Sequence, residues 1–457
     1  MQAFIDRASG IPVLDGAKML KSTYLSLGLL IDNVNPLAID SIRAIDSHFS
    51  GSVLSKDQIN TYLASSVLLH NLDSWAYLSH AIDSLLKGNP GIALHLGYYS
   101  ELRASMSFLA SEGVGIFNHR HICVDKDNAI IANPTIYINR NGRSIKKGAG
   151  THQFVWDSIQ KWTDSSIKPA DNDILQVFSV KDKSFLEWTT AFPYSASVNA
   201  RIILKKWLSK WNSDVRFFKN DRDTRNNVSY RPQRLIPGTQ LYSLPQVIDI
   251  LGSFWELMEP DQLNKFQLLD KYLLRVFLQE LYSFLPASIK LQESLESVIK
   301  RTLSNLGLSH EQSFIDFLND TSPIQHNLFI EAEKEAIDRS SKAVNALSVI
   351  ARATLMLRVS TGTSNLLLSK AGIQKDDLAF LFERFGVESG FWNPGSAPTN
   401  FDFLWDEIKD HIDDTTTWVS RKNPNLCLSE IYSDEVMPLS LNYFSQFHRA
   451  ALWGLAK

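Results

Sequence analysis

The chain has only two cysteines in 457 residues, Cys123 and Cys427, and they are far apart. This excludes a disulfide framework and any zinc site built from several cysteines, and it is typical of a protein of the reducing cytoplasm. No run of about 18 apolar residues occurs, so no membrane-spanning helix is predicted. The first residues lack a basic stretch followed by an apolar run, so no signal peptide is predicted.

The usual signatures of catalysis are also missing. The sequence contains no Walker A motif, no Rossmann glycine fingerprint, no HExxH and no GxSxG. It shows no signature of an RNA-recognition motif, a zinc finger or a helix-turn-helix, and no internal repeat. No cofactor is therefore predicted, and any function has to be inferred from local groups of residues.

Length and hydrophobic spacing predict a mainly α protein with two domains. A stretch rich in proline, 232–245, suggests a boundary near residue 240. We expect a helical domain over 1–240, with a small antiparallel β insertion of three or four strands at about 113–145. An all-α domain should follow over 241–457.

Apolar positions at helical spacing define the expected helices. In the first domain they are 55–86 as two helices, 92–112, 152–162, 171–180, 185–191 and 196–218. In the second they are 245–258, 260–285, 287–306, 310–319, 325–359, 374–386, 401–412 and 438–455.

Positive charge is concentrated in one segment, although the net charge of the chain is −3. Residues 201–234 hold ten Lys and Arg against three Asp, and 129–156 is a second basic stretch without acidic residues. If they share one surface, they suit the phosphates of RNA or DNA; the alternative is a pair of solvated segments. The expected nucleic-acid contacts are Lys205, Lys206, Lys210, Arg222, Arg231, Arg234, Arg140, Arg143, Lys146 and Lys147.

Arg225, Asn226 and Tyr230 end the first of these segments. A guanidinium, an amide and a phenol on one small surface can hold a phosphodiester, because the guanidinium presents a fork of donors. The alternative is a helix C-terminus whose cations are stabilised by the helix dipole, with a packed tyrosine.

Arg-Asn followed by Ser-Tyr, ending a helix that can pair with an earlier helix carrying Tyr98 and Tyr99, resembles the HEPN family. These are small α-helical bundles, often RNA-cleaving toxins or antiviral effectors. The resemblance covers about 58–112 and 196–232. It places Arg225 and Asn226 at the family's arginine and polar position, with Tyr230 where the family has a histidine.

Two functions follow from this resemblance. In the first, the protein is a non-catalytic or weakly catalytic component of a bacterial defence or toxin-type complex, which binds a protein partner and RNA. In the second, it is a metal-independent endoribonuclease in which Arg225 and Asn226 hold the phosphate, while Tyr230 or Glu101 replaces the histidine. A homodimer is expected in the second case, and the missing histidine favours the first.

His119, His121 and Asp125 form one further group. On a strand, residues two apart share a face, so both imidazoles and a nearby carboxylate can meet a divalent metal. The sequence offers no clear fourth ligand, and a solvent-facing hairpin is the favoured interpretation. No metal site is predicted.

Overall fold

The computed structural model is mainly helical with small antiparallel sheets, so the predicted fold class is confirmed. It describes residues 1–118, 120–133, 136–140, 143–147, 150–164, 174–194, 222–226, 241–261, 265–338, 343–422, 426 and 428–455. For 136–140 and 143–147 only the backbone is described.

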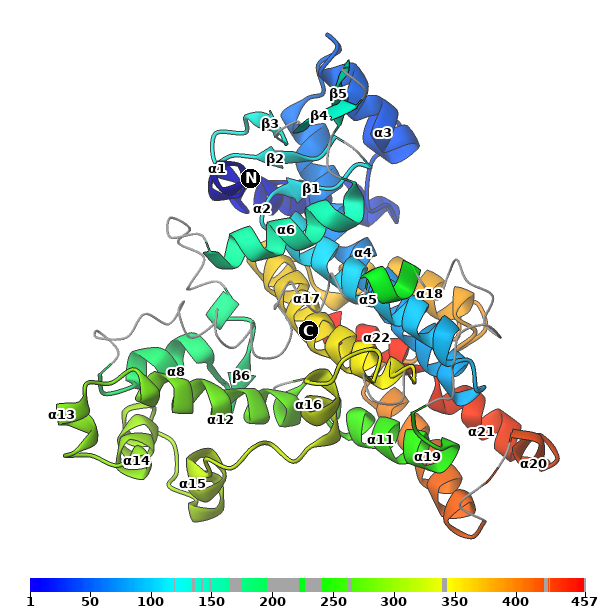
Figure 1. Ribbon diagram of the computed structural model, residues 1–457. Helices are drawn as coiled ribbons and strands as arrows, with labels where there is room; N and C mark the ends of the chain where they lie inside the picture. Colours follow the sequence, from blue (N-terminus) through cyan, green and yellow to red (C-terminus); the bar gives the residue numbers. More distant parts are fainter. Residues whose placement is uncertain are drawn as a thin grey trace.

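Three long helices form the centre: α4 (Lys56–Leu86), α5 (Pro90–Ser111) and α17 (Ala346–Lys370). Figure 1 shows them side by side, with α17 against α5. A capping box starts α4, since Ser55 and Gln58 bond each other's backbone N–H groups. The 55–86 stretch is one helix rather than the two expected, because no proline or glycine interrupts it.

The N-terminal elements pack around α4. They are α1 (Gln2–Arg7), α2 (Ile11–Met19), η1 (Leu20–Tyr24), η2 (Leu25–Leu27) and α3 (Pro36–His48). Helix α2 lies so close to α4 that a Cβ on Gly16 would sit 2.2 Å from the Asn60 carbonyl oxygen. Only glycine allows this approach of the two backbones.

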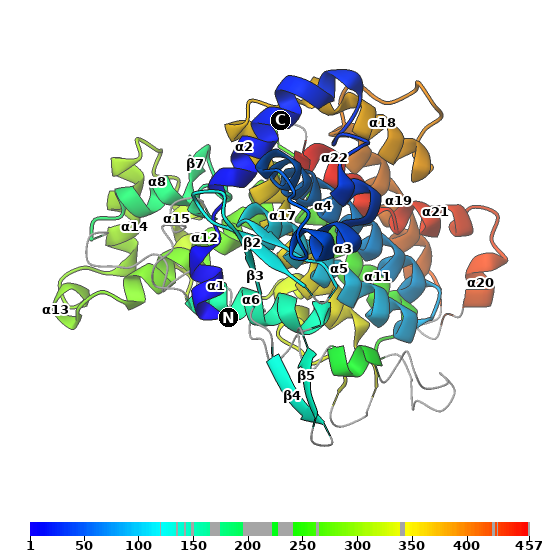
Figure 2. The ribbon, with the colours of Figure 1, turned by 90° about the horizontal axis from the view of Figure 1, so that it is seen from above.

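The predicted β insertion is present. Strands β1 (Val114–Gly115), β2 (Ile122–Val124) and β3 (Ile130–Ala132) form an antiparallel sheet in that order. Strands β4 (Ile136–Arg140) and β5 (Arg143–Lys147) form a separate hairpin, which projects from the helices in Figure 2. Strand β5 was not expected. Helix α6 (Thr151–Asp164) follows and packs across α5.

The remaining elements complete the chain. They are β6 (Ser179–Val180), β7 (Lys183–Ser184), α8 (Phe185–Ala191), α11 (Leu244–Glu256), α12 (Gln267–Ser283), α13 (Ala287–Lys290), α14 (Leu295–Asn305), α15 (Gln312–Asn319), α16 (Asn327–Ala332), η5 (Lys375–Leu378), α18 (Ala379–Glu388), α19 (Phe403–Ser420), α20 (Leu428–Tyr432), α21 (Met437–Phe444), η6 (Phe447–Arg449) and α22 (Ala450–Leu455).

The prediction of one long helix over 325–359 is wrong. The chain forms α16 and α17 instead, and the segment between them contains a β-bridge between Ile337 and Val344. The carbonyls of Ala332 and Lys334 accept hydrogen bonds from the buried Arg352. A continuing helix would use those carbonyls itself, so the tertiary contact competes with it.

The helix expected over 171–180 is also wrong at its end, where residues 179–180 form β6. The Ser179 N–H donates to Asp270 at 2.9 Å, and Arg358 donates to the Val177 carbonyl at 2.8 Å. These long-range bonds satisfy backbone groups that a helix would pair locally.

One continuous cluster of buried apolar residues extends from Phe4 to Leu455. Helices α17 and α22 of the C-terminal half pack on α4 of the N-terminal half. The division proposed near residue 240 thus does not correspond to two separate cores, because both halves contribute to the same one. Among the helices described, none combines the length and hydropathy needed to cross a membrane.

Candidate functional site

The site is centred on Arg225, in the short helical stretch 222–226. Its guanidinium carbon lies 5.3 Å from the Tyr98 ring centre and 5.7 Å from that of Tyr99, both on α5. The Arg225 segment thus meets the tyrosine-bearing helix α5. The faces of aromatic rings attract cations at these distances, which stabilises the guanidinium here.

Arg225 is 8% exposed, and its Nε has no hydrogen-bond partner. In the part of the chain that the structure describes, no carboxylate forms an ion pair with it. Burying a cation without a counter-charge is costly, and the two rings offset only part of that cost. A guanidinium with unused donors in such a setting suits an anion with several oxygens, such as phosphate.

An imidazole from a distant part of the chain joins the site. His152 of α6 places Nδ1 3.0 Å from the Tyr98 hydroxyl, and the Trp156 indole N–H donates to the same hydroxyl at 3.1 Å. Both residues lie on α6, which packs across α5. The Tyr98 hydroxyl therefore holds His152 in place beside Arg225.

Burial and nearby positive charges lower the pKa of both imidazoles of the site. Burial, with the positive charges of Arg225 and Arg222, lowers the pKa of His152 to about 4. Burial and Arg225 also lower the pKa of His95. Burial raises the pKa of Tyr98. At neutral pH His152 is neutral and able to accept a proton, while the arginine carries the positive charge.

Aromatic rings continue the site toward solvent. Tyr99 and Tyr77 stack with ring centres 5.6 Å apart and planes 27° from parallel, and the His95 ring lies 5.0 Å from Tyr99. These three side chains are half-buried, so part of each ring is accessible. Flat, partly exposed rings next to a cation are the arrangement on which unpaired bases stack.

Glu101 is not part of this site, which corrects its proposed catalytic role. It is fully buried, and its Oε1 lies 3.4 Å from Nε of the equally buried Arg352 on α17. Gly97 and Glu101 are four residues apart, and so they share the face of α5 that packs on α17. Tyr98 lies on the neighbouring face, and this separates the two groups.

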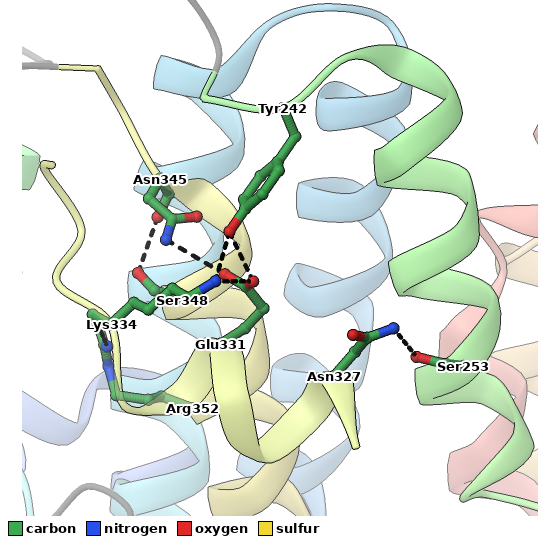
Figure 3. Close-up of polar contacts among 8 residues, drawn as sticks. All are labelled: Tyr242, Ser253, Asn327, Glu331, Lys334, Asn345, Ser348 and Arg352. Atoms are coloured by element: carbon green, nitrogen blue, oxygen red, sulfur yellow. Dashed lines mark hydrogen bonds and ion pairs between the residues drawn. The ribbon is translucent and has the colours of Figure 1, made fainter. Parts of the chain in front are cut away.

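Arg352 belongs to a polar network that Figure 3 shows. The buried carboxylate of Glu331 accepts hydrogen bonds from the Tyr242 hydroxyl at 2.7 Å and from Lys334 at 2.6 Å. Asn345 also donates to it, at 3.3 Å. The chain itself thus supplies the hydrogen-bond donors around this carboxylate. We therefore interpret the network as structural and not as a binding site.

The histidine group of the β insertion does not face solvent as expected. His121 is fully buried, stacks on Phe154 with ring centres 3.9 Å apart, and accepts a hydrogen bond from the Phe117 N–H. Asp125 forms an ion pair with Arg7 at 3.0 Å. His119 lies outside the described residues. Within those that are described, no group of His, Cys, Asp or Glu could hold a metal ion.

The expected nucleic-acid contacts are only partly described. Arg222 lies beside Arg225, close enough for its charge to affect His152. The basic residues of the β insertion lie on the hairpin β4–β5, where Arg140 pairs with Arg143. The other expected contacts are outside the described residues: Lys205, Lys206, Lys210, Arg231 and Arg234. Tyr230, proposed as a catalytic residue, also lies outside them. The shared positive surface stays a prediction.

Sequence reasoning missed His95 and His152. His95 is four residues before Tyr99 on α5, and this helical spacing could have indicated it. For His152 the local sequence contains no such signal, because its place depends on how α6 crosses α5. Comparison with protein-family models, curated proteins and solved structures finds no match for this chain.

Proposed function

We propose that this protein is a HEPN-like, non-catalytic or weakly catalytic RNA-binding component of a protein complex. Arg225 binds a phosphodiester of single-stranded RNA, and Tyr99, Tyr77 and His95 stack the neighbouring bases. The observation that carries the proposal is the buried guanidinium of Arg225, held against aromatic rings and with an unused donor. The protein partner and the role in bacterial defence rest on the resemblance to HEPN proteins.

Single strands fit better than duplexes. The rings of Tyr99 and Tyr77 can stack only on bases that are free of their own stack. Arg225 is recessed, so a flexible strand reaches it more easily than a stiff helix does. The preference for RNA over DNA rests on the resemblance, and the experiment below compares the two.

The test is binding of a short fluorescein-labelled single-stranded RNA, followed by fluorescence anisotropy at several salt concentrations. Arg225→Ala should weaken binding roughly tenfold to a hundredfold, since it removes charge-assisted bonds. It should also reduce the slope of log K against log salt by about 0.7, the value for one phosphate contact on a single strand. Single-stranded DNA and duplex RNA of the same sequence serve as competitors.

The matched control is Arg421→Ala, which removes an exposed arginine at the end of α19. It should leave the affinity and the slope within error of wild type. Thermal unfolding of each variant shows that the fold is retained. An Arg225→Ala protein that is folded and binds RNA with wild-type affinity and slope would overturn the proposal.

A second candidate is a metal-independent endoribonuclease, and the position of His152 favours it. The segment from Arg225 to Tyr230 has no histidine, but His152 supplies an imidazole to the same site. As a neutral base it could take the proton of an RNA 2′-hydroxyl, whose oxygen then attacks the adjacent phosphorus. The P–O5′ bond then breaks and the 5′-oxygen takes up a proton from water, which gives a 2′,3′-cyclic phosphate and a 5′-hydroxyl, while Arg225 stabilises the added negative charge.

Incubation of the purified protein with RNA in the presence of EDTA separates the two candidates. A nuclease yields products with cyclic phosphate ends, and both His152→Gln and Arg225→Ala abolish them. If wild type leaves the RNA intact while the binding assay succeeds, the nuclease is excluded and the binding function stands.

A further inference from the structure

A second candidate site lies between α4, α18 and the turn from α21 to η6. A cavity of about 1040 Å³ opens there, and residues 28–31 close one side of it. Known small-molecule pockets measure about 300–1,000 Å³, so this one is large enough for a drug-sized ligand. Its residues on α4 recur from 69 to 83 at helical spacing and form a single stripe along that helix.

His448 contributes a buried polar atom without a hydrogen-bond partner to the lining of this cavity. It lines the cavity, is 8% exposed, and its Nδ1 has no hydrogen-bond partner. Burial lowers its pKa to about 3, so the ring is neutral and offers one donor and one acceptor. The surrounding contacts are aromatic, with Phe391 at 4.5 Å and Phe385 at 6.0 Å between ring centres.

Two other histidines, the buried His121 and the half-buried His326, do have partners. His121 accepts from the Phe117 N–H, and His326 accepts from the Leu328 N–H. A buried polar atom without a partner costs about 1–3 kcal/mol. The unpaired Nδ1 of His448 is therefore a position where a ligand atom could form the missing hydrogen bond.

The charges around the cavity are already balanced. Lys87 pairs with Asp83 at 2.7 Å, and Arg384 pairs with Glu388 at 2.8 Å. Asp73, which also lines the cavity, faces Arg103 at 3.5 Å. Because each lining cation already has a carboxylate beside it, a phosphate would have to displace an existing partner. This disfavours anionic ligands.

Neutral hydrogen-bonding groups supplement His448. Gln446 lines the cavity, and its Oε1 accepts from Arg449 Nε at 2.9 Å, which leaves its amide NH₂ to donate. Aromatic and aliphatic side chains make up much of the rest, Phe380, Phe385 and Leu72 among them. Apolar side chains next to neutral donors and acceptors suit a flat ring that carries heteroatoms.

We infer that this cavity binds an uncharged heteroaromatic small molecule of the nucleoside type, with His448 as a hydrogen-bonding partner of its ring. The site is separate from the one around Arg225, and its existence does not depend on the function proposed for that site. The ligand enters as a neutral molecule, since the ion pairs at the cavity leave no cation for a phosphate.

Isothermal titration of the full-length protein with adenosine, guanosine, cytidine and uridine tests this inference. At least one nucleoside should bind saturably, and its 5′-monophosphate should bind at least about tenfold more weakly. His448→Phe should reduce the affinity roughly fivefold to tenfold, as expected for one lost hydrogen bond.

A second variant covers the case in which His448→Phe does not fold. Ala76 of α4 lines the cavity, so Ala76→Phe should fill part of it and abolish binding. Ala38→Phe adds the same ring to an exposed position of α3 and should bind like wild type. Absence of binding by all four nucleosides, equal affinity of Ala76→Phe and wild type, or a preference for the monophosphate would overturn the inference.

Discussion

Two buried arginines, Arg225 and Arg352, pack against neighbouring faces of α5, and the groups around them differ. Arg352 sits against Glu101 and donates to the carbonyls of Ala332 and Lys334. Arg225 lies over two tyrosine rings, and no carboxylate of the described chain pairs with it. The first guanidinium has a carboxylate and two carbonyls of the protein beside it, whereas the second has aromatic rings and no carboxylate among the described residues.

We interpret Arg352 as a structural arginine, and the binding role proposed for Arg225 rests on this difference. A buried cation whose partners belong to the chain stabilises that one arrangement of helices. A cation without such partners lowers the stability of the folded chain, and an anionic ligand can compensate it. Arg358, which donates to both carboxylate oxygens of Asp270 at 2.8 and 2.7 Å, is a second example of the structural kind.

The largest expected effect tests this contrast through stability. Arg352→Met leaves the buried Glu101 without its cation, and it should lower the free energy of unfolding by about 3–5 kcal/mol. Arg225→Met removes a cation that lacks an ion-pair partner, so it should change stability by less than about 1 kcal/mol. Denaturant unfolding of both variants measures the difference, and equal losses would remove the distinction.

A double variant sharpens the same comparison. Glu101→Leu with Arg352→Met replaces the whole pair by apolar side chains, so no charge is left buried alone. The double variant should recover most of the loss of about 3–5 kcal/mol that Arg352→Met causes. No recovery in the unfolding curve would mean that the pair contributes through its packing rather than through its charge.

The next effect concerns the ring that faces solvent beside Arg225. Tyr99→Leu removes a stacking face and should weaken single-stranded RNA binding by about 1–3 kcal/mol. The salt dependence should stay as in wild type, because stacking releases no counterions. Anisotropy titrations at several salt concentrations check this. A reduced slope would show that Tyr99 acts by holding Arg225 in place.

The smallest effect is on the pH dependence of stability. The pKa of His152 is 6.5 in the unfolded chain and about 4 in the folded chain. Between these values the unfolded chain binds more protons, so the free energy of unfolding decreases as the pH falls from about 6.5 to about 4. His152→Phe removes this contribution and should make the decrease shallower. Unfolding curves across this range measure it, with His48→Phe as a control at a histidine outside the site.

Parts of the site could be read from the sequence and parts could not. The pairing of Arg225 with the Tyr98–Tyr99 helix was expected only from the resemblance to the HEPN family. The role assigned to Glu101 was wrong, because a helical pattern shows which residues share a face but not which neighbour that face meets. His152 could not be found, as it reaches the site from a separate helix.

Local sequence was enough to predict the helical character of the chain, a helix over 92–112 that corresponds to α5, and the antiparallel insertion that follows. These features depend on local backbone preferences and on apolar spacing. Tertiary structure alone decided where α16 ends, which partner Glu101 has, and that His152 meets Tyr98. The reason is that a buried polar group must find its partner among residues that are close in space, whatever their distance along the chain.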